Sequence, residues 1–142
     1  MSKITSINPS TEEPLEDIEV ASEEEVSQAV SNARKAFPQW SKTTIDERIK
    51  WLKKLIPLIE YKKDEISRTI AKEMGKPMDQ SLEESERVVN HIKFYAKNIK
   101  DFLKQETVFG DNGEKDILMY DPLGVIAIIT PWNYPVTTVF SA

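Results

Sequence analysis

The sequence predicts an α/β fold that is incomplete without further strands. Short β-prone runs open the chain, and three stretches with the apolar spacing of amphipathic helices follow them. Near the C-terminal end, the run LGVIAIIT is continuous, apolar and rich in β-branched residues, which is typical of a buried parallel strand with helices on both faces. No other run in the 142 residues is a comparable strand. We therefore expect the partners of this first buried parallel strand to lie beyond Ala142.

The N-terminal β segments are the runs KITSINP and LEDIEVA. The residues between them, NPSTEEP, are rich in the types that favour turns. We expect a loose hairpin or two paired edge segments over residues 3–21.

Capping-box patterns mark the starts of the first two helices. Ser22 precedes Glu25 by three residues, and Thr44 precedes Glu47 by the same spacing. In this pattern the two side chains satisfy backbone amides that the first helical turn leaves free. Apolar residues at helical spacing follow each start, so the sequence predicts helices beginning near residues 23 and 45.

Prolines and a third capping pattern set the other helix boundaries. Pro38 is expected to stop the first helix, and Pro57 predicts a kink or two separate helices within the second stretch. The segment 75–77 breaks the second stretch, and Ser81 with Glu84 is expected to open the third helix. This third stretch, to about residue 103, has the clearest apolar stripe in the chain.

A β ribbon is predicted over about residues 105–121. Its two β-prone runs flank the segment 110–113, GDNG, which is a strong hairpin signal. In the second run Ile117 and Met119 alternate with Leu118 and Tyr120, so both faces of the ribbon are apolar. We expect a neighbouring element against each face.

Composition narrows the classes of function. A net charge of −5 and a pI near 5.0 argue against nucleic-acid binding, because clustered Lys and Arg supply most of that affinity. The absence of cysteine excludes a disulfide framework, a thiolate metal site and a thiol nucleophile. No run reaches the ~18 apolar residues of a membrane span, and no apolar leader opens the chain. We expect a cytoplasmic protein without nucleic-acid or membrane partners.

Glycine and histidine provide no further site. The four glycines form neither a dinucleotide-binding GxGxxG motif nor a phosphate-binding P-loop. His91 is the single histidine, and we expect a structural or surface role for it and no metal site.

The hexapeptide Thr130–Pro135, TPWNYP, is the candidate functional motif. It follows the predicted parallel strand, and ligands of open parallel sheets bind where the chain leaves the carboxyl end of a strand. The Asn133 amide could donate a hydrogen bond to an oxygen that develops negative charge. The alternative is an ordinary strand-to-helix turn, with Asn133 as a helix cap and Trp132 as a packing residue. The residues alone leave both interpretations open.

The motif PLGVIAIITPWNYP resembles the signature of the aldehyde dehydrogenase superfamily, in which a Pro-Leu-Gly-Val strand leads into Thr-Pro-Trp-Asn-Phe-Pro. The resemblance extends over the whole chain, through the segments INPSTEE, ASEEEVSQAVSNARKAFPQW, DERIKWLKKL, EMGKP and FYAKNIKDFLKQETV. The last two segments resemble most the succinate-semialdehyde dehydrogenase branch. Tyr134 stands where the family more often has phenylalanine, and Pro57 is a second departure.

The resemblance implies the fold and the roles of particular residues. It implies that residues 1–142 are the incomplete N-terminal part of a Rossmann-type cofactor domain, including a ribbon at about 105–121 through which family subunits assemble as homo-oligomers. Asn133 matches the catalytic asparagine whose side-chain amide holds the oxygen of the aldehyde substrate. The nicotinamide side of the groove for NAD or NADP matches Ile129, Thr130, Pro131, Trp132 and Asn133.

Two hypotheses about function follow. In the first, the chain is the N-terminal fragment of an NAD(P)-dependent aldehyde dehydrogenase, with succinate semialdehyde as a candidate substrate. It is inactive alone, because the family's cysteine nucleophile, glutamate base and glycine-containing cofactor turn follow the asparagine motif. In the second, the chain is a non-catalytic interaction module that docks on a complete dehydrogenase or on a separate C-terminal half. An unrelated self-sufficient enzyme has no motif to support it.

Overall fold

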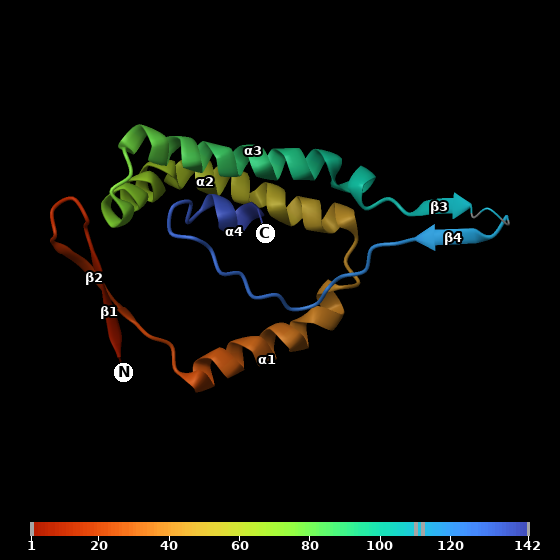
Figure 1. Ribbon diagram of the computed structural model, residues 1–142, viewed down its shortest axis with the longest axis horizontal. Coiled ribbons are helices and arrows are strands. Elements are labelled where there is room, and N and C mark those ends of the chain that lie inside the picture. Colours follow the sequence, from red (N-terminus) through yellow and green to blue (C-terminus); the bar gives the residue numbers. More distant parts are fainter. Residues whose placement is uncertain (1, 110, 112, 142) are drawn as a thin grey trace.

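The computed structural model describes residues 2–109, 111 and 113–141. Two long antiparallel helices form its centre, a short helix lies beside them, and two separate β-hairpins occupy opposite ends (Figure 1). The elements in order are β1 (Lys3–Ile7), β2 (Pro14–Glu19), α1 (Glu23–Trp40), α2 (Ile45–Met74), α3 (Met78–Phe102), β3 (Glu106–Phe109), β4 (Lys115–Leu118) and α4 (Thr137–Ser141).

The first two helices begin as the sequence predicts. The Ser22 hydroxyl accepts a hydrogen bond from the Glu25 amide at 3.2 Å, and the Glu25 carboxylate accepts one from the Ser22 amide at 2.8 Å. Thr44 and Glu47 form the same reciprocal pair, at 3.2 and 2.7 Å. Both capping boxes are therefore confirmed, and each satisfies two amides that a helix start leaves free.

The prolines do not divide the helices. Helix α1 continues through Pro38 to Trp40, and α2 is one helix that includes Pro57 and ends at Met74. The prediction of a stop at Pro38 is therefore wrong, and of the two alternatives predicted at Pro57, a kink or two separate helices, the second is wrong. A proline removes one backbone hydrogen bond from a helix. Helix α1 continues for only two residues after Pro38, and α2 continues through Pro57 because it packs along α3.

Helix α3 starts before its predicted capping residues. Its first residue is Met78, its N-cap is Pro77, and no side chain caps it. Ser81 and Glu84 are fully buried inside the helix, and the Ser81 hydroxyl donates to the Pro77 carbonyl at 3.0 Å. The prediction that Ser81 and Glu84 open the helix is wrong, because both side chains face the packed side of α3 instead.

The core lies between α2 and α3. Small polar side chains hold the two helices together, with the Ser67 hydroxyl 3.1 Å from the Ser81 carbonyl and 3.2 Å from the Ser85 hydroxyl. Farther along, an apolar cluster joins α2 and α3, and α4 closes one side of it. The buried members of this cluster are Ile59, Val88, Val89 and Ile92, with Leu55, Ile56, Val136 and Phe140 packed against them.

Both predicted β-hairpins are present. Strands β1 and β2 pair antiparallel, with an irregular register between Ser6 and Ile7. Strands β3 and β4 pair antiparallel from Glu106 opposite Leu118 to Phe109 opposite Lys115. Gly110 and Asn112 of the predicted turn lie outside the described residues.

The run predicted as a buried parallel strand is an exposed, extended segment. It crosses from β4 past α1 to the short helix α4 (Figure 1). Among the described residues it has no strand neighbour, and Ile129 is 96% exposed. The strand is therefore absent here, because a strand forms only where another backbone satisfies its hydrogen bonds.

The chain exposes far more surface than a compact protein of its size. Its accessible surface is 11254 Å² for a mass of 16.3 kDa. A compact monomer of this mass exposes about 7,500 Å². The excess is apolar to a large extent, because residues of α1, of the ribbon and of segment 123–129 remain uncovered.

Candidate functional site

The predicted site residues follow one another along an open turn before α4. Ile129, Pro131, Trp132 and Asn133 are exposed, and Thr130 is half-buried. The Asn133 side chain makes no hydrogen bond to the described part of the chain, and Trp132 is 79% exposed. In this structure, therefore, Asn133 is not a helix cap and Trp132 is not a packing residue.

Glu84 caps the helix that Asn133 was expected to cap. One carboxylate oxygen of Glu84, Oε1, accepts hydrogen bonds from the amides of Val136 at 3.0 Å and Thr137 at 3.2 Å. These amides lie at the N-terminal end of α4, where helices leave backbone donors free and where negative charge is favourable. Glu84 therefore joins the interior of α3 to the turn that carries Asn133.

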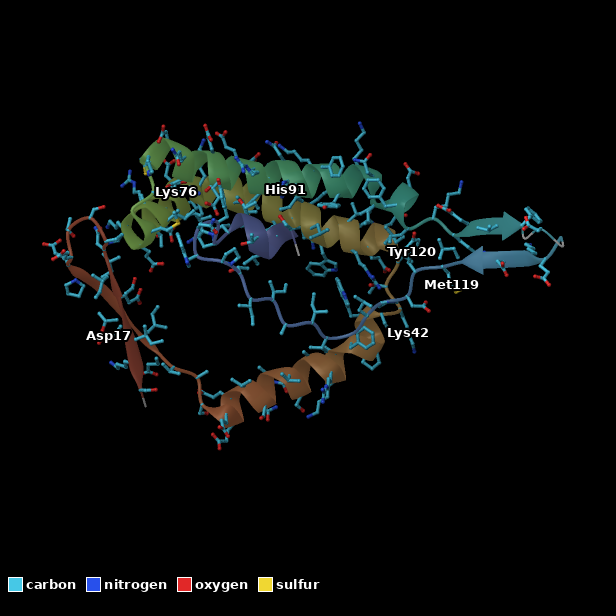
Figure 2. The ribbon with its side chains drawn as sticks, in the orientation of Figure 1. Asp17, Lys42, Lys76, His91, Met119 and Tyr120 are labelled. Carbon is cyan, nitrogen blue, oxygen red and sulfur yellow. The ribbon has the colours of Figure 1, made fainter. Side chains whose placement is uncertain are left out.

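Lys76 holds the other oxygen of this carboxylate. Its ammonium nitrogen lies 2.6 Å from Glu84 Oε2, and the exposed fractions of the two side chains are 7% and 0%. The same nitrogen donates to the Asn133 carbonyl at 3.3 Å and lies 4.0 Å from the ring centre of Tyr134. Figure 2 shows Lys76 at the connection between α2 and α3. One buried ion pair therefore contacts both sides of the turn.

The local backbone explains why Lys76 is directed inward. Helix α2 ends at Gly75, whose left-handed conformation, with φ of 70°, turns the chain sharply. Pro77 is the N-cap of α3, and its ring fixes φ at −53° just before the first helical residue. Lys76 lies between these two constrained residues, and Pro9 in the turn of the β1–β2 hairpin approaches the preceding Gly75 closely.

The roles of Lys76 and Glu84 were not predicted from the sequence. Segment 75–77 was interpreted only as a helix breaker and Glu84 only as a capping residue. One sequence signal indicated that Glu84 is buried. Glu84 precedes Val88 by four residues and therefore lies on the apolar face of α3. A carboxylate on a buried face requires a partner, and the spacing alone does not identify Lys76.

Other polar groups near the turn have structural contacts. The ring nitrogen Nδ1 of the half-buried His91 lies 3.2 Å from the Ser141 hydroxyl, which ties α3 to α4. The Thr137 hydroxyl is buried without a hydrogen-bond partner among the described residues. Those residues contain no group of three or more side chains arranged to hold a metal ion.

A groove of about 410 Å³ opens beside the turn. Helix α2 supplies one wall, and the turn supplies Trp132, Pro135 and Val136. The α2 wall includes Ile66, Ile70 and Met74. This mostly apolar groove can accept the hydrocarbon part of a small molecule.

No helix in the described part of the chain combines the length and apolar character needed to cross a membrane.

Comparison with known proteins identifies the family. The model of the aldehyde dehydrogenase family matches residues 1–142. The chain is 34% identical over 133 residues to 1-pyrroline-5-carboxylate dehydrogenase 2 of Bacillus subtilis, covering 93% of this chain and 26% of that protein. It is 34% identical over 137 residues to the D-glyceraldehyde dehydrogenase (NADP+) of Picrophilus torridus, covering 96% of this chain and 28% of that protein. A succinate semialdehyde dehydrogenase of Escherichia coli is 33% identical over 130 residues, covering 92% and 28% of the two chains.

A solved structure gives the same result. The NADP-dependent glyceraldehyde-3-phosphate dehydrogenase of Bacillus halodurans, complexed with NADP, superposes with a TM-score of 0.87 at 30% identity. The match covers 99% of this chain and 30% of that one. The chain therefore belongs to the aldehyde dehydrogenase family and corresponds to its N-terminal part. It spans under a third of the length of the relatives it matches.

Proposed function

We propose that this chain is the N-terminal part of an NAD(P)-dependent aldehyde dehydrogenase and that it supplies Asn133 to the active site. The observation that carries the proposal is that Asn133 has a fixed backbone and an exposed side chain. Its backbone carbonyl is held by Lys76, while its side-chain amide is exposed and makes no hydrogen bond to the described residues. A donor at a fixed position is what an oxyanion-stabilising group requires.

In this proposal Asn133 acts on the oxygen of the aldehyde. When a thiolate attacks the carbonyl carbon, the carbonyl oxygen gains negative charge, and the Asn133 side-chain N–H donates to it. The chain contains no cysteine, so the attacking thiolate belongs to a part of the enzyme outside these residues. The chain alone is therefore inactive.

The proposed cofactor contact is limited to the nicotinamide side. Ile129, Pro131, Trp132 and Asn133 are exposed, Thr130 is half-buried, and the extended part has no strand partner among the described residues, so this segment suits one wall of a cofactor groove. When bound there, NAD or NADP would accept the hydride of the aldehyde. The four glycines at positions 75, 110, 113 and 124 form no phosphate-binding loop, so other parts of the enzyme would hold the phosphates.

We propose a small aldehyde as the substrate, with succinate semialdehyde as the first compound to test. The relatives from Escherichia coli and Picrophilus torridus are named as dehydrogenases of succinate semialdehyde and D-glyceraldehyde, which supports this class. The groove lined by Trp132, the residue before Asn133, supports it as well, since this groove is mostly apolar.

The ribbon is proposed as an assembly element of the complete enzyme. Phe109, Met119 and Tyr120 are exposed on the segment 105–121, and the main contacts of β3 and β4 in the described part of the chain are with each other. Exposed apolar residues of this kind mark protein–protein contacts. Residues 1–142 would then form part of a cofactor domain with the ribbon projecting from it.

A chimera tests the proposed function. Residues 1–142 replace the matching part of the Picrophilus torridus relative, and oxidation of succinate semialdehyde and D-glyceraldehyde is followed by NADH or NADPH absorbance. We expect turnover by the chimera and none by the isolated chain. A folded chimera that oxidises neither aldehyde with either cofactor would contradict the proposal, as would turnover by the isolated chain.

A further inference from the structure

We infer that Lys76 and Glu84 are positioning residues that fix the turn carrying Asn133. The two charges do more than join α2 to α3, because each also holds backbone atoms of the turn. Lys76 donates to the carbonyl of Asn133, and Glu84 accepts from the amides of Val136 and Thr137. The ion pair therefore contacts the turn on both sides of Tyr134.

The burial of the pair makes these contacts strong. Neither side chain is appreciably exposed, and hydrogen bonds that involve a charged group are roughly twice as strong as neutral ones. A buried charge without partners is strongly unfavourable, so the pair constrains the turn to the geometry that keeps it satisfied. The carboxylate makes three such contacts, one to Lys76 and two to backbone amides.

Tyr134 adds a further constraint at the centre of the turn. The Lys76 ammonium lies 4.0 Å from the ring centre, and the Arg87 guanidinium carbon lies 5.6 Å from it. Cations over an aromatic ring are attracted by its electron density. The ring therefore stays close to the ion pair, while the neighbouring Asn133 is exposed.

The other restraints lie on the C-terminal side of the turn, where Val136 and Phe140 pack against the α2–α3 cluster and the Ser141 hydroxyl lies 3.2 Å from His91 Nδ1. The segment before the turn is extended and, within the described residues, has no strand partner. Helix α4 is a single short turn whose first amides depend on Glu84. Without the ion pair, the backbone from residue 133 to residue 137 would lose its hydrogen bonds to charged groups, and the packing of Val136 would remain.

Amide hydrogen exchange in the 142-residue chain tests the inference. The test variant is Lys76→Met with Glu84→Met, which removes both charges together with the oxygen that accepts from the Val136 and Thr137 amides, and so leaves no unpaired ion in the interior. The matched control is Lys93→Met with Glu60→Met, which removes an exposed 3.5 Å ion pair between the same two helices. Exchange is measured at Val136 and Thr137 in the turn and at Val88 and Ile92 in the core, together with the backbone order parameter of Asn133.

We expect exchange at Val136 and Thr137 to accelerate by about tenfold or more in the test variant, since their bonds to a charged acceptor are lost. The order parameter of Asn133 should fall from about 0.85 toward about 0.6. Exchange at Val88 and Ile92 should change little, and the control should leave all of these values unaltered. The exchange readout does not depend on aldehyde oxidation, although the chemical consequence for Asn133 rests on the proposed function.

Three results would overturn the inference. In the first, the turn amides of the test variant exchange at the original rate. In the second, turn and core amides accelerate by the same factor, which would show a general loss of stability. In the third, Val136 and Thr137 of the unaltered chain exchange as fast as residues 125–129, which would show that the ion pair does not hold the turn.

Discussion

Pro9 lies directly against Gly75, so the turn of the first hairpin contacts the end of helix α2. A Cβ atom added to Gly75 would lie 3.1 Å from Cγ of Pro9, and the φ of Gly75 is 70°. The hydroxyl of Ser6, in the same hairpin, donates to the Glu73 carboxylate at 3.4 Å. The hairpin therefore covers the glycine that precedes Lys76.

Gly75→Ala should lower the free energy of unfolding by about 2 to 3 kcal/mol, because it combines a left-handed backbone with a close contact. The control is Gly113→Ala, since Gly113 also has positive φ, 78°, but no atom within 4 Å of an added Cβ. In the control, the free energy of unfolding should fall by about 1 kcal/mol. Equal losses in urea titrations of the two variants would show that Pro9 does not restrict Gly75.

Val88→Ala should reduce stability by about 2 kcal/mol, because it removes two methyl groups from the centre of the α2–α3 core. Val88 is 0% exposed, whereas Val139 on α4 is 46% exposed. Val139→Ala should therefore cost well under about 1 kcal/mol. Urea unfolding measures both changes, and similar values for the two variants would contradict the assignment of the core.

Glu47 should titrate below its ordinary value, because its pKa is lowered by the hydrogen bond from the Thr44 amide and then by the Thr44 hydroxyl. The charged form is therefore favoured in the folded state. The resulting stability is present above pH 4.5 and is lost as the pH falls through the lowered pKa of Glu47.

Thr44→Ala removes the hydroxyl and keeps the backbone amide, so the pKa of Glu47 should rise partway toward 4.5. An NMR titration of the Glu47 carboxylate measures the change. Ser22→Ala disrupts the other capping box and serves as the control, with no expected effect on Glu47. An unaltered Glu47 pKa in Thr44→Ala would show that the hydroxyl contributes nothing.

The isolated chain should bind an apolar dye such as ANS strongly, because its surface is about 1.5 times that of a compact monomer of its mass. The comparison is a compact globular protein of similar mass at the same concentration. Dye fluorescence equal to that of the compact protein would contradict the exposure of the ribbon and of segment 123–129.

Local sequence signals predicted most of the secondary structure. The capping boxes at Ser22 and Thr44 and both hairpins follow from contacts between residues near one another in sequence. The family resemblance located the whole chain in the N-terminal part of the aldehyde dehydrogenase fold. Such features depend little on the rest of the molecule.

Features that depend on distant contacts were predicted less well. The strand expected over residues 123–130 does not form here, because its backbone has no partner among the described residues. Lys76 and Glu84 were missed because their roles depend on the approach of a turn more than fifty residues away in sequence. The continuity of α2 through Pro57 reflects packing on α3 that a proline rule alone does not include.

The most direct test of the central claim is the kcat of the chimeric dehydrogenase with Asn133→Ala. If Asn133 stabilises the developing negative charge on the aldehyde oxygen, kcat should fall by about 10²-fold or more, as on loss of one oxyanion donor. Asn90→Ala, at an exposed position of α3, is the matched control and should retain kcat. An Asn133→Ala chimera that is folded and as active as the control would contradict the claim.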